Sequence, residues 1–137
     1  MVVALLTSAG GCDTPTIAAA AESRYVSTGA VAATLDLRRV GDRYVVALSG
    51  GGSDQAGAAA AADCHVRAVG TLRDHTLDAT FTGIETSTFA YSETRARREQ
   101  RKLRLVFRPP NVEVTRADVE GYCGLGATFI GIYRPAK

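Results

Sequence analysis

The stretch of sequence that decides the fold is "ATLDLRRVGDRYVVAL", residues 33–48. Apolar side chains recur there at every second position on both sides of a short turn signal; they are Ala33, Leu35, Leu37, Tyr44, Val46 and Leu48. Gly41 and Asp42 supply the turn, because glycine and aspartate are typical of tight turns. A period of two places alternate side chains on one face of a strand. The stretch therefore predicts a β-hairpin with one buried face.

The same period continues along the rest of the chain. We expect further strands over residues 64–72, 77–81, 103–108, 112–114 and 126–135. "RDHT", residues 73–76, predicts a turn. Pro109 and Pro110 end a strand because proline has no amide hydrogen to donate to a ladder. About seven or eight short strands at intervals of roughly ten residues predict one small all-β domain, an antiparallel barrel or sandwich.

Three segments depart from this simple alternation. Residues 49–63 are rich in glycine, alanine and serine, which predicts a loop. Residues 82–101 are long for a hairpin connection, which is typical of functional or disordered loops. The best helical candidate, residues 94–105, is almost wholly polar in its first half, so we expect no helix of useful length. The final strand is apolar on both faces, with Ile130 and Ile132 on one of them, so we expect it in a central position or beneath a covering loop.

The first residues form a pattern of their own. A short apolar run, residues 1–6, is followed by small residues as far as Gly11, which is typical of the end of a signal peptide. The closing "AGGC", residues 9–12, resembles the lipobox of bacterial lipoproteins, with alanine where leucine is usual. The resemblance implies export and a diacylglyceryl anchor on Cys12. The alternative is a frayed terminus that carries an incidental thiol.

On the lipoprotein interpretation the chain has three parts. Residues 1–11 are a signal-peptide remnant, residues 12–23 are a small and polar flexible tether, and residues 24–137 are the β-domain. Asp13, directly after the anchor, resembles the inner-membrane retention signal of some Gram-negative lipoproteins, and the choice of membrane stays open. We expect the protein to be lipid-anchored at the periplasmic face of a bacterial membrane.

The chain has three cysteines, so one stays unpaired if the other two form a disulfide. With Cys12 as the anchor, we expect Cys64 and Cys123 to pair, because thiols oxidise in an exported protein. The alternative is a pair of buried, reduced cysteines. Together with the two cysteines, His65 and His75 are residue types that bind zinc. Adjacent strand residues such as Cys64 and His65 point to opposite faces, so we expect no metal.

No catalytic constellation is visible in the sequence. A Gly-x-Ser-x-Gly nucleophile motif is missing. Ser53 and Asp54 are neighbours in an expected loop, where nothing positions a base for the serine. Four carboxylates in expected loops cannot be paired for glycosidase chemistry from the sequence alone; they are Glu85, Glu93, Asp118 and Glu120. We expect a protein without catalytic activity and without a cofactor.

Basic residues concentrate in one segment. Seven of the chain's 16 lysines and arginines are Arg95, Arg97, Arg98, Arg101, Lys102, Arg104 and Arg108. Such clusters attract anionic surfaces, and arginine suits bidentate recognition of carboxylates. We expect Arg97, Arg98 and Arg101 to contact a partner; the alternative is a solvated hairpin tip that keeps an edge strand soluble. The formal net charge of +2 is too small to indicate nucleic acid.

A second resemblance concerns function. "LSGGGSD", residues 48–54, is similar to the Ser-Gly loop that bacterial lysozyme inhibitors insert into an enzyme's cleft, and immunity proteins against wall-degrading toxins are also small exported β-domains. The resemblance implies a non-catalytic protein that binds a protein partner in the cell envelope. It assigns no inhibitory residue; we expect Ser49, Gly50, Ser53 and Asp54 to contact the partner. Two alternatives stay open: a carrier with a small apolar ligand inside the barrel, and an accessory subunit of an envelope complex.

Overall fold

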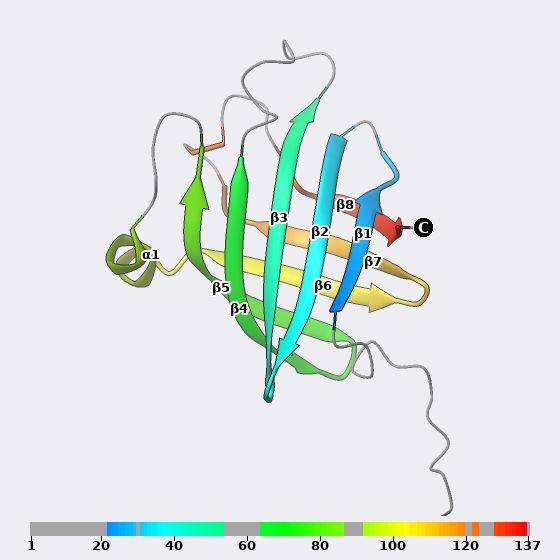
Figure 1. Cartoon of the computed structure of the whole chain (residues 1–137), viewed down its shortest axis with the longest axis horizontal. Coiled ribbons are helices and arrows are strands. Elements are labelled where there is room, and N and C mark those ends of the chain that lie inside the picture. The colour runs from blue at the N-terminus through cyan, green and yellow to red at the C-terminus, as the bar shows by residue number, and fades with distance from the viewer. Residues whose placement is uncertain are drawn as a thin grey trace, which may run out of the picture.

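The structure is a computed structural model that describes residues 22–29, 31–53, 64–86, 92–119, 122–123 and 128–136. Its elements are β1 (Glu22–Ser27), β2 (Val31–Val40), β3 (Arg43–Ser53), β4 (His65–Arg73), β5 (Thr76–Glu85), α1 (Glu93–Glu99), β6 (Lys102–Arg108), β7 (Asn111–Ala117) and β8 (Gly131–Pro135). Each strand pairs antiparallel with the next, and β8 pairs with β1, which closes the barrel (Figure 1). The predicted all-β antiparallel fold is confirmed, and the barrel is the architecture found.

The hairpin predicted from residues 33–48 forms β2 and β3. Val40 and Arg43 are the last paired residues on either side of the turn. Between them Gly41 has a φ of 64°, a conformation that glycine adopts without steric cost. On the inward face Leu35 and Val46 are fully buried. The alternation in the sequence therefore sorts the side chains between the barrel interior and the outer surface, as expected.

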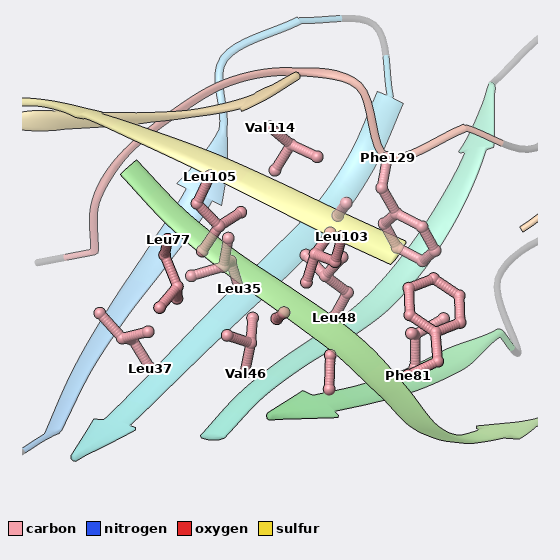
Figure 2. Close-up of a cluster of buried hydrophobic side chains, with 14 of the residues drawn as sticks. Leu35, Leu37, Val46, Leu48, Leu77, Phe81, Leu103, Leu105, Val114 and Phe129 are labelled. Carbon is pink, nitrogen blue, oxygen red and sulfur yellow. The ribbon is translucent and has the colours of Figure 1, made fainter. Parts of the chain in front are cut away.

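Apolar side chains fill the interior of the barrel. Figure 2 shows side chains from opposite walls meeting in the space that the strands enclose. The largest fully buried residues include Tyr133, Phe81, Phe129, Leu35, Leu48 and Leu77, and no buried residue among those that the structure describes is polar or charged. Burial of one such side chain contributes roughly 1.5–3 kcal/mol. The barrel interior is therefore a packed hydrophobic core.

Several element boundaries differ from those expected. β1 begins at Glu22, inside the segment assigned to the tether. β3 continues to Ser53 and β5 to Glu85, so the two long loops begin later than predicted. A bulge between Ala32 and Ala33 lengthens the β2–β3 pairing. At this bulge Gly50 has a φ of 98°, and a Cβ there would collide with the carbonyl group of Ala32. The glycines after Ser49 thus continue a strand, where a loop was predicted.

α1 is a short helix that the sequence did not predict. The Ser92 hydroxyl caps its first turn by accepting a hydrogen bond from the Arg95 amide at 3.1 Å, which satisfies one free donor of the helix end. Gln100 ends it in the left-handed conformation. Ala96 is its only buried residue. The helix therefore lacks the repeated apolar positions by which a helix is normally predicted from sequence. Among the described residues, no helix is long and apolar enough to cross a membrane.

The last strand takes the central position that was one of the two expected for it, but only one of its faces is buried. Ile130 and Ile132 are 48% and 46% exposed, whereas Phe129 and Tyr133 are buried. β8 lies between β7 and β1, and a strand of a closed barrel has one face inside and one outside. The two isoleucines lie on the outside. The strand is therefore hydrogen-bonded on both edges, but only one of its faces is buried.

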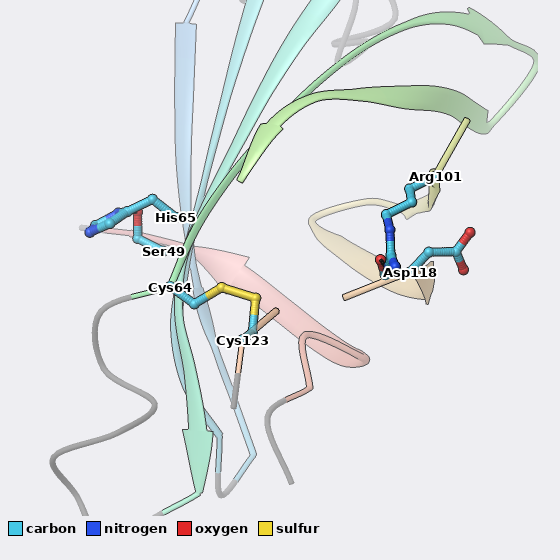
Figure 3. Close-up of a disulfide and its surroundings, with 6 residues drawn as sticks. All are labelled: Ser49, Cys64, His65, Arg101, Asp118 and Cys123. Atoms are coloured by element: carbon cyan, nitrogen blue, oxygen red, sulfur yellow. Dashed lines mark hydrogen bonds between the residues drawn. A yellow bond between two sulfur atoms is a disulfide. The ribbon is translucent and has the colours of Figure 1, made fainter. Parts of the chain in front are cut away.

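The disulfide predicted between Cys64 and Cys123 is present. The two Cα atoms lie 5.3 Å apart, and both cysteines are 2% exposed. Cys64 directly precedes β4, and Cys123 lies on the connection between β7 and β8. The bond ties two distant parts of the chain together at the barrel end that is opposite the β2–β3, β4–β5 and β6–β7 turns (Figures 1 and 3).

Candidate functional site

A groove of about 530 Å³ lies on the outer wall of the barrel, mainly over β3, β4 and β5. Its polar lining comes from residues that alternate with buried ones; they are Asp36, Ser49, His65, Arg67, Thr82 and Glu85. The strand register places Ser49 opposite His65, and His65 opposite Glu85. We call this concavity the outer groove. It exists because three neighbouring strands present polar residues in the same row.

A serine and a histidine face each other in the outer groove. Ser49 Oγ and His65 Nδ1 are joined by a hydrogen bond of 2.9 Å (Figure 3). His65 follows Cys64 directly, and the Gly50 amide donates to the Cys64 carbonyl at 3.0 Å. The disulfide therefore holds the strand end that carries His65. The hydrogen bond and the neighbouring disulfide therefore hold Ser49 and His65 in place on the outer wall.

Charged groups complete the outer groove. Asp36 accepts two hydrogen bonds from Arg24, at 2.7 and 3.3 Å. Arg67 and Glu85 are exposed, and within the described part of the chain neither makes a hydrogen bond or an ion pair. The groove thus offers to a molecule from outside the guanidinium of Arg67, two residues along β4 from His65, and the carboxylate of Glu85, opposite His65 on β5. Arginine forms strong bidentate pairs with carboxylates.

A carboxylate also lies opposite His65 in the strand register. A serine becomes a nucleophile when its base is itself oriented by a third group. The carboxylate is that of Glu85, and no hydrogen bond or ion pair joins it to His65. Ser49 and His65 are both on the open outer wall, where water solvates them. The arrangement is suited to hydrogen bonding with a partner.

The predicted site residues are placed as follows. Ser49 and Gly50 lie in β3, and Ser49 contributes its side chain to the outer groove. Ser53 ends β3, but its side chain and the whole of Asp54 lie outside the described residues. Sequence reasoning missed the groove's other members on β4 and β5, because it treated "HVR" only as a strand. The alternation that buries Val66 was the available signal that its neighbours face outward together.

Arg101 has a structural place in the fold. Its guanidinium lies 4.2 Å from the ring centroid of Tyr122, and Arg95 covers the same ring at 5.1 Å. The Tyr122 hydroxyl donates to Glu99, whose carboxylate also accepts from both arginines, at 2.8 Å from Arg95 and 3.2 Å from Arg101. Arg101 Nη1 also donates to the Asp118 carbonyl at 2.6 Å. These contacts join α1 to the β7–β8 connection.

The other two predicted contact arginines differ from each other. Arg97 pairs with Glu93 one turn earlier in α1, at 2.7 Å. Arg98 is exposed and makes no hydrogen bond or ion pair with any described residue. Figure 3 shows Arg101 on one side of the disulfide and Ser49 on the other. The structure therefore places Arg101 apart from Ser49, and none of the three arginines lines the outer groove.

Most charges of the basic segment are compensated locally. Arg104 pairs with Asp78 at 2.7 Å and Arg108 with Glu113 at 3.0 Å. The sequence does not show these pairs, because Asp78 and Glu113 lie on the strands next to β6 and not beside the arginines in the chain. Exposed pairs of this kind contribute about 0–1 kcal/mol each to stability. They reduce the positive field that the sequence alone suggests, whereas Arg98 has no ion-pair partner among the described residues.

Glu99 gives a pH-dependent prediction. Hydrogen bonds from Arg95 first, and then from Tyr122 and Arg101, outweigh partial burial and lower its pKa from 4.5 to about 2. A lowered pKa stabilises the fold above pH 4.5, and this stabilisation is lost as the pH falls toward 2. We expect Glu99→Gln to destabilise the protein at pH 7, and urea unfolding should show the gap to wild type closing in acid. A gap that stays constant from pH 7 to pH 2 contradicts the assignment. Glu93→Gln is the control, since its exposed helical pair contributes at most about 0.5 kcal/mol.

The comparisons with known proteins give no family. No protein-family model, no curated protein and no solved structure matches the chain. Within the described residues, no group of three or more His, Cys, Asp or Glu side chains is placed to hold a metal ion.

Proposed function

We propose that the protein is an exported, non-catalytic barrel that binds a protein partner in the cell envelope and inhibits a wall-degrading enzyme. The observation that carries the proposal is the outer groove, where Arg67, which has no partner among the described residues, lies near the Ser49–His65 pair. Wall-degrading glycosidases act through carboxylates in an open cleft. A free guanidinium with neighbouring hydrogen-bonding groups is complementary to such a cleft.

Two further observations support export. The Cys64–Cys123 disulfide fits an oxidising compartment. The "AGGC" sequence at residues 9–12 resembles a lipobox, although it lies outside the described residues. On this proposal Cys12 carries the lipid, and residues 13–21 connect it to β1. The anchored barrel then holds its outer groove within reach of enzymes that act on the wall.

The carrier alternative has less support. A carrier needs space for its ligand inside the barrel, and the interior here is occupied by leucine, valine and phenylalanine side chains (Figure 2). An accessory subunit of an envelope complex needs a protein contact surface just as an inhibitor does. Loss of enzyme activity on binding separates the inhibitor from the accessory subunit.

The test is capture with a functional readout. The full chain is immobilised through its C-terminus, and purified wall-degrading hydrolases are passed over it together with unrelated hydrolases of similar charge. We expect at least one wall-degrading hydrolase to be retained and to lose lytic activity in proportion to the barrel added. Retention without loss of activity supports the accessory subunit instead. Retention of no wall-degrading hydrolase, or equal retention of the unrelated hydrolases, contradicts the proposal.

A further inference from the structure

A second concavity lies further around the wall, over β5, β6 and β7. It encloses about 240 Å³ and is lined by Asp78, Thr80, Lys102, Arg104 and Arg116, with the backbone of the intervening residues. The register sets Arg104 between Asp78 on one side and Arg116 on the other, and Lys102 opposite Thr80. Three cationic side chains from two neighbouring strands thus surround one small space, which we call the basic pocket.

A β-bulge brings Arg116 into the basic pocket. The register of β6 with β7 shifts between Arg104 and Leu105, so that Leu105 pairs with Val114 and Arg104 pairs with Arg116. Thr115 is the extra residue, and it is exposed together with Arg116. Strict alternation from the buried Val114 would point Arg116 inward. Bulges occur often next to functional sites because they redirect a side chain in this way.

The three cations keep free donors toward the basic pocket. Arg104 donates to Asp78 through Nε alone, at 2.7 Å, and its two terminal nitrogens have no partner among the described residues. Lys102 Nζ makes one hydrogen bond, to Thr80 Oγ1 at 3.0 Å. Arg116 uses Nε and Nη2 on a carboxylate, and its Nη1 has no partner within the described parts of the chain. N–H groups from three side chains therefore remain for an incoming acceptor.

The charges around the basic pocket do not balance. Lys102, Arg104 and Arg116 carry three positive charges, whereas Asp78 and Asp118 supply two negative ones. Like charges directly opposite each other on paired strands are destabilising, and Arg104 faces Arg116 in that way. The two ion pairs are about half exposed on their arginine side, so they contribute little to stability. Fold stability alone does not account for this arrangement.

We propose that the basic pocket binds the phosphate group of a phosphate ester, independently of the protein contact at the outer groove. One negative charge on a ligand would balance the excess positive charge of the pocket. Planar guanidinium groups match pairs of phosphate oxygens, and a lysine ammonium adds a point charge. The pocket is smaller than the roughly 300–1,000 Å³ of sites that enclose whole ligands. It therefore suits a phosphate group whose ester substituent lies outside.

The test uses the full chain labelled with ¹⁵N and titrated with glycerol 3-phosphate at low ionic strength, with acetate at equal ionic strength as the reference anion. We expect saturable shifts of the amide signals of Asp78, Lys102, Arg104 and Arg116, and weaker binding of acetate. Arg104→Gln should weaken phosphate-ester binding at least tenfold. Arg108→Gln, an exposed arginine of the same strand outside the pocket, is the matched control and should change it less than twofold. Equal melting temperatures of both variants and wild type verify the fold.

A second arm identifies the source of the phosphate. Co-sedimentation compares vesicles of phosphatidylglycerol in phosphatidylcholine with vesicles of phosphatidylcholine alone. Binding of glycerol 3-phosphate that depends on Arg104 assigns a soluble ester, and Arg104-dependent binding seen only with phosphatidylglycerol vesicles assigns a lipid headgroup. Binding that is equal for acetate and the phosphate ester, or that Arg104→Gln and Arg108→Gln affect equally, overturns the proposal. Shifts confined to other parts of the barrel also overturn it.

Discussion

Replacement of Gly70 by alanine is expected to destabilise the barrel by about 3 kcal/mol or more. Gly70 of β4 pairs with Ala79 of β5. A Cβ at position 70 would collide with the carbonyl oxygen of Asp78 and would lie 2.6 Å from the Ala79 Cα atom. These are backbone atoms, which cannot move aside without separating the two strands. Intrinsic preference favours alanine over glycine within a strand by roughly 0.5–1 kcal/mol. The collision outweighs this preference, so the substitution lowers the stability.

The matched control for Gly70 is Gly29→Ala. A Cβ at Gly29 meets nothing within 4 Å among the described atoms, and its φ is not in the left-handed region. Alanine there should leave the stability unchanged or raise it by about 0.4–1 kcal/mol, because it restricts the unfolded chain. Urea unfolding of both variants and wild type measures the difference. Equal stability of the two variants would show that β4 and β5 do not approach each other as described.

Removal of the disulfide is expected to have the second large effect. Cys64 and Cys123 are 59 residues apart in the sequence, and the loop-entropy relation gives a stabilisation of about 4 kcal/mol for a bridge of that span. The double variant Cys64→Ala/Cys123→Ala should lose about that much free energy of unfolding. All proteins are compared with Cys12 replaced by serine, so that no third thiol exchanges with the pair.

Reduction provides the internal control for this prediction. A phosphine reductant should shift the urea midpoint of the disulfide-containing protein toward that of the double variant, and it should leave the double variant unchanged. The cross-link also holds the end of β4 that carries His65. Equal midpoints with and without reductant, together with full stability of the double variant, would contradict a disulfide that supports the barrel.

The alternation of apolar residues was enough to predict an all-β antiparallel domain, but not to decide between a barrel and a sandwich. It failed for β1 because only Tyr25 of that strand is buried, so the sequence shows no period there. It failed for α1 because Ala96 alone faces the core. The stability of that helix comes from its Ser92 cap and from side-chain pairs one turn apart. Local capping chemistry is present in the sequence, but it is a weak signal without an apolar stripe.

The outer groove, the candidate site, was harder to predict because it depends on the register of the strands. Ser49, His65 and Glu85 share one row only when three strands are aligned, and the bulge after Arg67 shifts that alignment by a residue. From the sequence, Arg101 was likewise expected to contact a partner together with Arg97 and Arg98. In the structure its guanidinium contacts Tyr122 and Glu99. Strand pairing brings together residues that are far apart in the sequence. Composition and local spacing do not show which residues meet in this way.

The most direct test of the proposed function is a titration of inhibition. A wall-degrading hydrolase that the barrel retains is assayed with increasing amounts of wild-type protein, of Arg67→Ala and of Arg98→Ala. Both substituted arginines are exposed and free of described partners, but only Arg67 lies in the outer groove. We predict at least tenfold weaker inhibition by Arg67→Ala, about 1.4 kcal/mol of binding free energy, and less than twofold change for Arg98→Ala. Equal inhibition by all three proteins, or loss with Arg98→Ala alone, would contradict binding through the groove.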